Sequence, residues 1–391
     1  MNASFSLEEP DLTIVIPCLN EEDTLGTCLS KLQTVAKEEE FDLEIIVADN
    51  GSQDKSIEIA SKFNARLVHV SRKGYGAALM GGIDQAKSSF ILMADADDSY
   101  DFLEVPKFFQ KLKEGFDLVQ GCRLPKGGGK ISQGAMPWSH RHIGNPLFTF
   151  LARNWFGSPI NDVYCGMRAF RKSFYDSLKM KCNGMEFATE MIIKAANIGA
   201  NTAEVPITLH KDGRIQHPPH LRTIRDGWRT LQFFLLCAPA KLFLLPGITM
   251  CFAGIIGSLL GYLGSSLGPI NLGAHTMLGS SLLIVSGYQA ILMHNLSLNL
   301  SERIGIFRSQ GTRRYKGFIL PRGITLSLVL LLAGIFLWAK VFLSWQSSGF
   351  ESLDYGSTMK VVIPGATLIS LSLETLIFFL FQSWVQVETN N

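Results

Sequence analysis

The chain has 391 residues, of which 47% are hydrophobic and 18% charged, with a formal net charge of +2 and a mean hydropathy of +0.19. This hydrophobicity excludes a disordered chain, and seven cysteines are too few at this length for a disulfide scaffold. The near-zero net charge argues against a protein that binds nucleic acid through a basic surface, so we expect no nucleic-acid partner.

The charged residues are concentrated in the first part of the chain. Residues 1–229 hold 27 of the 36 Lys and Arg and 29 of the 34 Asp and Glu, which leaves 9 and 5 for the rest. A charged, soluble-type region is therefore joined to a nearly uncharged one. No apolar run precedes Leu12, so the pattern of a signal peptide is missing. The cysteines form no Cys-x-x-Cys pair, which favours buried thiols in a reducing compartment.

Strand-like and helix-like segments alternate through the charged region. Leu12–Pro17 is a β-rich run, and Asn20 is predicted to cap the helix that follows. The further strand-like runs are 43–48, 66–70, 90–94, 117–120 and 203–207, and the helical stretches are 21–39, 54–63, 75–87 and 103–114. This alternation predicts a mainly parallel α/β sheet wrapped by helices. Ligands of such sheets bind beyond the carboxyl ends of the strands.

Polar residues follow each of the first five predicted strands, which indicates one polar ligand with several charges. They are Pro17, Asn20, Glu21, Asp49, Asn50, Gly51, Ser52, Arg72, Lys73, Gly74, Asp95, Asp97, Asp98, Gln120 and Arg123. Asp95-Ala-Asp97-Asp98 places several hard oxygen ligands together, as a divalent cation requires. An acidic strand end alone is more often a turn or a helix cap, but the Gly-rich segment that begins at Lys73 favours a cation-binding site.

Three connecting segments carry open alternatives. The Gly-rich stretch 123–134 is predicted to be irregular, either a lid that closes on substrate or a flexible surface loop. The stretches 142–156 and 221–237 have apolar and basic faces, so they lie in the bilayer interface or pack against the sheet. His217 and His220 flank two prolines, which favours a structural loop over a metal site.

Four apolar stretches follow, and each has the roughly 20 residues that a helix needs to cross a bilayer. They cover 242–263, 274–298, 323–343 and 360–384. Lys and Arg cluster before the first stretch and between the second and third, whereas the connections 264–273 and 344–358 have neither. The positive-inside rule therefore places the charged region and both termini in the cytoplasm. Burial of these stretches in a large soluble core is the less favoured alternative.

Two features inside these apolar stretches each have more than one possible role. Gly257 and Gly261 form a Gly-x-x-x-Gly pattern, which lets helices approach closely but also arises by chance. Glu374 is an ionisable residue within the fourth stretch, where it either contacts a lipid head group or another helix, or lies close enough to the interface to be hydrated.

Five motifs together resemble family 2 glycosyltransferases of the GT-A fold, and more narrowly the polyprenyl- or dolichyl-phosphate sugar synthases. They are Ile16-Pro-x-x-Asn20-Glu-Glu, Asp49-Asn-Gly-Ser-x-Asp54, Lys73-Gly-Tyr-Gly-Ala, Asp95-Ala-Asp97 and Gly121-Cys-Arg123. The resemblance covers roughly residues 11–222. It implies a nucleotide-diphosphate sugar donor, Mg²⁺ or Mn²⁺, and inverting transfer to a membrane-embedded polyprenyl phosphate.

The resemblance also implies roles for individual residues. Donor binding is implied for Pro17, Asn20, Glu21, Asp49, Gly51, Ser52, Lys73, Gly74 and Ala96. Asp97 would bind the cation, Asp95 would orient the donor sugar or a metal-bound water, and Asp98 would be a further ligand, since Ser99 stands where the family often has Gln. The catalytic candidates are Asp95, Asp97, Arg123 and Arg168. The candidates for the acceptor phosphate are Arg123, Arg168, Lys211, Arg214 and Arg222.

Taken together, the sequence predicts an α/β domain of GT-A, Rossmann-like type at 1–220, an amphipathic juxtamembrane segment at 221–240 and about four membrane helices at 241–391. Segments 162–168 and 185–190 resemble the acceptor side of the family. A processive polysaccharide synthase is an alternative, but its Gln-x-x-Arg-Trp motif is absent. A non-enzymatic membrane scaffold is another, against which the intact Asp95, Asp97 and Lys73 count. Whether the chain forms a homo-oligomer is left open.

Overall fold

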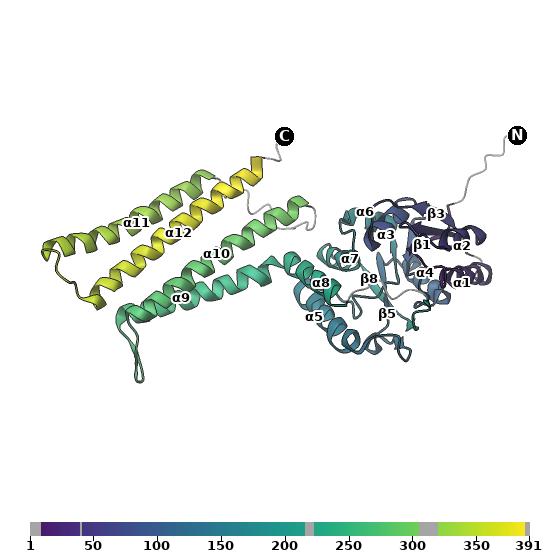
Figure 1. The fold of residues 1–391 in the computed structure, drawn as a ribbon, viewed down its shortest axis with the longest axis horizontal. Helices are drawn as coiled ribbons and strands as arrows, with labels where there is room; N and C mark the ends of the chain where they lie inside the picture. The colour runs from purple at the N-terminus through teal and green to yellow at the C-terminus, as the bar shows by residue number, and fades with distance from the viewer. Residues whose placement is uncertain (1–8, 40, 216–222, 305–319, 388–391) are drawn as a thin grey trace. The chain divides into compact units, whose positions relative to one another are not determined.

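The computed structural model describes residues 9–39, 41–215, 223–304 and 320–387. The chain divides into two compact units, Met1–Cys237 and Ala238–Asn391 (Figure 1). The predicted juxtamembrane segment is split between them: its helix belongs to the first unit, and the second unit begins at Ala238.

The first unit is built on a seven-stranded sheet in the order β3-β2-β1-β4-β7-β5-β8. The strands are β1 (Leu12–Cys18), β2 (Leu43–Asp49), β3 (Arg66–His69), β4 (Phe90–Met93), β5 (Leu118–Cys122), β7 (Arg168–Arg171) and β8 (Thr202–Pro206). All neighbours pair in parallel except β7, which is antiparallel to both β4 and β5. The predicted mixed, mainly parallel α/β fold is confirmed. β7 was not predicted, because Arg-Ala-Phe-Arg is short and has charged ends.

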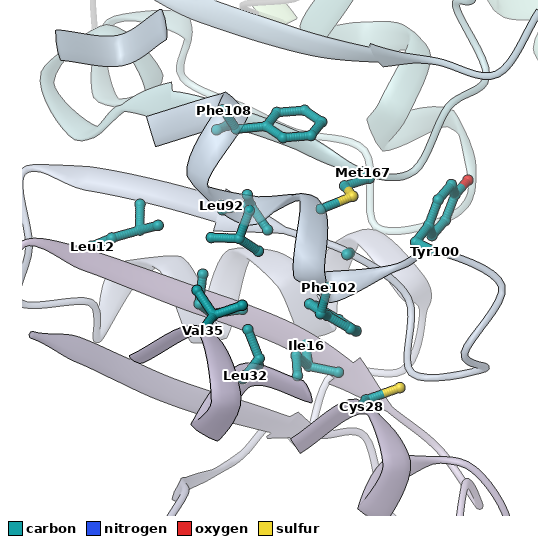
Figure 2. Packing of buried hydrophobic residues seen from close by; sticks show 14 of the residues in the cluster. Leu12, Ile16, Cys28, Leu32, Val35, Leu92, Tyr100, Phe102, Phe108 and Met167 are labelled. Carbon is teal, nitrogen blue, oxygen red and sulfur yellow. The ribbon is translucent and has the colours of Figure 1, made fainter. Parts of the chain in front are cut away.

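Helices cover both faces of the sheet. The helices of this unit are α1 (Leu25–Glu38), α2 (Ser56–Lys62), α3 (Tyr75–Asp84), α4 (Val105–Lys113), α5 (Asn145–Phe156), α6 (Lys172–Leu178), α7 (Glu186–Asn197) and α8 (Thr223–Cys237). Leu12 and Ile16 on one face of β1 share a core with Leu32 of α1 and Phe108 of α4, as Figure 2 shows. On the opposite face, Gly82 of α3 lies against Val15 and Ala48. The strands are apolar on both faces because both are covered.

The start of α1 differs from the prediction. Asn20 was expected to cap the helix, but it has a left-handed φ of 58° and α1 begins only at Leu25. Turns occupy the residues between them, where the amides of Thr24 and Leu25 both donate to the Glu21 carbonyl. The short polar side chain of Asn tolerates the left-handed region, so Asn20 serves the turn after β1 instead of the helix.

The Gly-rich stretch 123–134 has local order that was not expected. It contains a 3₁₀ turn, η2 (Pro125–Gly127), and a two-residue strand, β6 (Lys130–Ile131). β6 pairs in parallel with β9 (Thr208–Leu209). The stretch is therefore hydrogen-bonded to the chain that follows β8.

Helices α5 and α8 pack together (Figure 1). The Phe148 ring of α5 lies 5.1 Å from Tyr164 and 5.5 Å from Phe234 of α8, measured between ring centroids. These buried aromatic contacts account for one face of each helix. The other face of α5 exposes large apolar residues, among them Leu147 and Phe150. The alternative that these amphipathic segments pack within the domain therefore holds for one face of each helix, and their placement at the bilayer interface stays a prediction.

The second unit contains, among the residues described, four helices long and apolar enough to cross a membrane, which agrees with the predicted number. They lie in α9 (Leu245–Leu263, preceded by η4, Ala240–Leu244), α10 (Ala274–Ile304), α11 (Leu320–Ser347) and α12 (Tyr355–Val387). Strands β10 (Ser266–Leu267) and β11 (Ile270–Asn271) form a hairpin between α9 and α10.

Glycines allow α9 and α10 to approach closely. Gly247, Gly254 and Gly261 recur every seven residues, and a Cβ at any of them would crowd the backbone of α10. The Gly257–Gly261 pattern is therefore part of a longer contact between helices of the same chain.

Hydroxyl groups join α12 to its neighbours. Ser281 and Tyr288 of α10 bond to Thr367 and Thr375 of α12, each at 2.7 Å between oxygens. Because both members of these pairs advance together along the chain, α10 and α12 run parallel. Glu374 lies beside Thr375, and its Oε2 is buried without a hydrogen-bond partner among the described residues.

Candidate active site

The carboxyl end of β2 forms a tight turn organised by Asp49. Its carboxylate accepts hydrogen bonds from the amides of Gly51 and Ser52 at 3.1 and 2.9 Å, and His69 Nδ1 of β3 lies 3.2 Å away. Burial alone would raise the pKa of Asp49, but the bonds from Ser52, His69 and Gly51 outweigh it and hold the pKa below its usual value. Asp49 therefore shapes the turn that was predicted to bind the donor.

The turn after β1 is bonded to the turn after β2. Asn20 donates its amide to Ser52 Oγ at 3.1 Å and accepts the Gln53 amide on its side chain at 2.8 Å. Glu21 donates its amide to Ser56 Oγ at 2.8 Å. Pro17 pairs in register with Ala48 of β2. These predicted donor residues are thus brought together at one edge of the sheet.

The glycines of Lys73-Gly-Tyr-Gly are required by packing. Gly74 has a φ of 130°, and a Cβ there would overlap the Asn183 carbonyl. A Cβ on Gly76 would overlap the Cys182 carbonyl. Lys73 Nζ donates to the Asn50 carbonyl at 2.6 Å, which brings it to the turn after β2.

The acidic segment after β4 holds its three carboxylates in different settings. Asp95 accepts a hydrogen bond from the Tyr75 hydroxyl at 2.8 Å. Burial, and then the charge of Asp97, raise the pKa of Asp95 to about 7 despite that bond. Asp97 Oδ1 accepts from the Ser99 amide and hydroxyl at 3.0 and 2.6 Å. Asp98 has a φ of 57° and pairs with Lys31 of α1 at 2.8 Å.

These settings change the expected ligand set. Asp98 was expected to be a further metal ligand, but its side chain is directed to Lys31. Ser99 orients Asp97, so the residue found in place of the family's Gln still acts on that carboxylate. Ala96 packs its side chain into the core cluster, which leaves only its backbone for a ligand.

A guanidinium lies against the Asp97 carboxylate. Arg214 Nε and Nη2 donate to the two carboxylate oxygens of Glu21 at 2.8 and 2.5 Å. Its Nη1 lies 3.3 Å from Asp97 Oδ2 and 2.8 Å from Asp212 Oδ2. Burial lowers the pKa of Arg214, but Glu21 and Asp97 more than compensate, so the group stays protonated.

The residues at this edge fit a divalent cation by their chemistry. Asp95 and Asp97 present carboxylate oxygens, which Mg²⁺ and Mn²⁺ prefer. Ser99 donates to Asp97 Oδ1, and the positively charged Arg214 guanidinium contacts the other oxygen, Oδ2. Among the residues described, however, no group of three or more His, Cys, Asp or Glu is placed to hold a metal. Water or a bound phosphate would have to complete the shell.

Arg123 is held by a buried carboxylate. Its Nε and Nη2 each lie 2.8 Å from Asp162, whose side chain is fully buried, and the Arg123 amide donates to the same carboxylate. Tyr100 stands 3.5 Å from its Nη1. Asp162 is in turn fixed by Glu204, which accepts its amide. Arg123 is therefore rigidly placed at the carboxyl end of β5.

Arg168 lies inside the fold, which argues against its expected contact with the acceptor phosphate. It has no exposed surface, and its guanidinium donates to the carbonyls of Cys165 and Ala188, each at 2.8 Å. Because these carbonyls belong to the segment before β7 and to α7, the role of Arg168 in this structure is to join the two.

The remaining predicted residues fall at the end of the domain. Lys211 is exposed, three residues before Arg214. Arg222, with His217 and His220, lies outside the described residues. Sequence reasoning missed Tyr75 and Asp212 as side chains that contact the site. Tyr75 stands inside a motif that had been noticed, but its direction toward Asp95 depends on how α3 packs.

Comparisons with known proteins give the family. Residues 13–179 match the family described as glycosyl transferase family 2. Residues 298–386 match the glycosyltransferase family 2 C-terminal transmembrane region. A low-salt glycan biosynthesis hexosyltransferase of Haloferax volcanii is 33% identical over 365 residues, which cover 90% of this chain and 86% of that protein. The chain belongs to glycosyltransferase family 2. The expected family, fold class and enzyme class are thereby confirmed, and this family 2 glycosyltransferase is an integral membrane protein.

Other relatives and solved structures match a smaller share of the chain. A dolichyl-phosphate hexose transferase of Haloferax volcanii is 32% identical over 197 residues, or 50% of this chain and 82% of that protein. A solved structure of glucosyl-3-phosphoglycerate synthase from Mycobacterium tuberculosis, with Mn²⁺, uridine diphosphate and glucosyl-3-phosphoglycerate, is 19% identical at a TM-score of 0.46. It covers 59% of this chain and 80% of that one.

Proposed function

We propose that this glycosyltransferase moves a hexose from a nucleotide-diphosphate sugar to a polyprenyl phosphate at the cytoplasmic leaflet, with inversion at the anomeric carbon. The observation that carries the proposal is the convergence of Asp95, Asp97 and Arg123 at the carboxyl ends of β4 and β5, beside the turns of β1 and β2. The relative named as a dolichyl-phosphate hexose transferase supports a lipid phosphate as the acceptor.

In the proposed reaction, the acceptor phosphate attacks the anomeric carbon and the bond to the nucleotide diphosphate breaks. A phosphate is already anionic at neutral pH, so no strong protein base is needed. The task of the protein is to place the reactants and to stabilise charge. A divalent cation at Asp97 would neutralise the diphosphate as it leaves. Lys73, whose Nζ reaches the turn after β2, would act on the same diphosphate.

For the acceptor phosphate we propose Arg123, with Lys211 and Arg222 as further candidates. Arg123 is fixed by Asp162 and Tyr100, so its position does not depend on the substrate. Because Asp162 takes Nε and Nη2, Nη1 is the nitrogen that would contact a phosphate. Arg214 is bonded to Glu21 and Asp97 in the described structure, so it would reach a phosphate only after leaving them.

A surface on α5 supports a lipid acceptor. Leu147 and Phe150 of α5 are exposed, as are Ile143, in the π-helical turn His140–Gly144 that precedes α5, and Trp138 before it. Arg141 and Arg153 are exposed in the same stretch of chain and would meet anionic head groups. We propose that this surface of the catalytic domain (1–220), followed by the juxtamembrane segment (221–240) and the membrane domain (241–391), holds the site at the leaflet.

The proposal is tested by incubating membranes that contain the full chain with labelled UDP- and GDP-sugars, a polyprenyl phosphate and MgCl₂ or MnCl₂. A labelled lipid from one donor is expected, and it should be lost with EDTA and in Asp97→Asn. The matched control is Asp117→Asn, an aspartate that bonds the Asn201 amide outside the site. Absence of labelled lipid with every donor would contradict the proposed acceptor, and an EDTA-resistant product would contradict the cation.

A further inference from the structure

Arg214 belongs to a segment that lies across the acidic end of β4. The amide of His210 donates to the Ser99 carbonyl at 2.9 Å, and that of Gly213 donates to the Asp97 carbonyl at 3.0 Å. The amide of Ile215 donates to the Asp23 carboxylate at 3.0 Å. The 210–215 segment is thus hydrogen-bonded both to the acidic segment and to the turn that precedes α1.

Its guanidinium is placed where a bound cation would contact Asp97. Ser99 occupies Asp97 Oδ1, which leaves Oδ2 as the less committed atom. Arg214 Nη1 lies 3.3 Å from that Oδ2, and the Arg214 side chain is only 10% exposed. A divalent cation on Oδ2 would meet a like charge within contact distance, in a partly buried setting where such repulsion is strong.

We infer that Arg214 is an internal counterion of Asp97 that the divalent cation and the donor must displace. The inference rests on the proposed function, because it assumes that Asp97 takes part in cation binding. Glu21, Asp97 and Asp212 neutralise the guanidinium. Binding of the cation then requires the guanidinium to leave Asp97 Oδ2.

The direct test measures Mn²⁺ binding to the purified full chain without donor, from the decrease of the free Mn²⁺ signal in electron paramagnetic resonance. Arg214→Gln removes the competing charge, so its dissociation constant for Mn²⁺ should fall at least tenfold. Lys211→Gln removes an equal charge from an exposed position of the same segment and should change the constant less than twofold. An unchanged or higher constant in Arg214→Gln would overturn the inference.

Asp212→Asn provides a second variant that spares the guanidinium. Asp212 contacts Arg214 through its carboxylate, so the amide should weaken the hold on the guanidinium and tighten Mn²⁺ binding, but by less than Arg214→Gln does. If Asp212 were itself a cation ligand, Mn²⁺ binding would weaken instead, and the inference would be overturned. Melting temperatures of all three variants show whether each is folded.

The labelled-lipid assay separates this inference from the proposed function. If the wild type transfers sugar but Arg214→Gln does not bind Mn²⁺ more tightly, only this inference is wrong. If Arg214→Gln binds Mn²⁺ more tightly but the wild type labels no lipid, only the proposed acceptor is wrong. If no Mn²⁺ binds and no lipid is labelled, both are wrong.

Discussion

At the scale of residues, the two candidate carboxylates are each oriented by a neighbouring hydroxyl. Tyr75 donates to Asp95, and Ser99 donates to Asp97. Tyr75 reaches Asp95 from the start of α3, so the position of a carboxylate after β4 depends on a residue that follows β3. Such hydrogen bonds fix the direction of a charged group that would otherwise rotate.

Replacing Tyr75 with Phe should therefore affect catalysis more than folding. A hydrogen bond to a charged group contributes about 1.5–3 kcal/mol, which corresponds to a roughly 10- to 100-fold loss in kcat if it is needed in the transition state. The KM for the donor should change little. Tyr175→Phe is the control. Tyr175, in α6, stacks on Phe170 with 5.3 Å between the ring centroids and is not part of the site. Full kcat in Tyr75→Phe would show that Asp95 is held by other groups.

The lowered pKa of Asp49 predicts that the stability of the fold depends on pH. Its pKa is lowered in the folded state, so its ionised form stabilises the fold above its unfolded pKa of roughly 4, and this contribution is lost as the pH falls through that range. Asp49→Asn should be less stable than wild type by about 1–2 kcal/mol at pH 7, judged from the charged hydrogen bonds it loses.

The measurement is a set of melting curves of the full chain between pH 3 and 7. The difference between wild type and Asp49→Asn should shrink as the pH falls below about 4, because the unfolded carboxyl is protonated there while the folded one is protonated only at lower pH. Asp42→Asn, at an exposed position, should show a flat difference. A constant difference for Asp49→Asn would mean that its charge does not stabilise the turn.

Many of the site residues could be predicted from the sequence, because parallel strands bring their carboxyl ends to one edge. Asp95, Asp97 and Asn20 were placed at that edge in this way. The directions of side chains could not be predicted. Asp98 turns to Lys31 because of its left-handed backbone, and Arg168 is buried because it begins an unforeseen strand. Both depend on packing between segments distant in sequence.

At the scale of elements, glycines in helices show how packing decides the effect of one methyl group. Gly76 is in α3, where a Cβ would overlap the Cys182 carbonyl, and Phe187 lies close by. Gly227 is in α8, where a Cβ would meet nothing within 4 Å. Both positions are helical, so the gain in helix propensity from alanine is similar.

The two substitutions should therefore have opposite signs. Gly76→Ala should destabilise the full chain by about 1–3 kcal/mol through overpacking. Gly227→Ala should stabilise it by up to about 1 kcal/mol. Denaturation midpoints, with far-ultraviolet circular dichroism to check the fold, measure both. Equal effects at the two sites would contradict the close contact between α3 and the 182–184 backbone.

At the scale of the whole molecule, the proposed topology is open to direct labelling. Asn271 and Ser348 are exposed in connections without Lys or Arg, whereas Lys126 is exposed in the catalytic unit. A cysteine at 271 or 348 should react with a membrane-impermeant maleimide in intact cells. A cysteine at 126 should react only after permeabilisation. The native thiols are buried or half-buried, which keeps the background low. Labelling of a cysteine at 126 in intact cells would mean that the orientation is opposite to the proposed one.

The antiparallel strand β7 divides the sheet into two functional regions. It separates β3-β2-β1-β4, whose ends carry the candidate donor turns, from β5 and β8. Because it runs backwards, its first residue, Arg168, pairs with both Met93 and Gln120 at the reactive edge. The loop that enters β7 therefore arrives beside the site without interrupting the donor half. The length of that loop can therefore change without altering the pairing of β3, β2, β1 and β4.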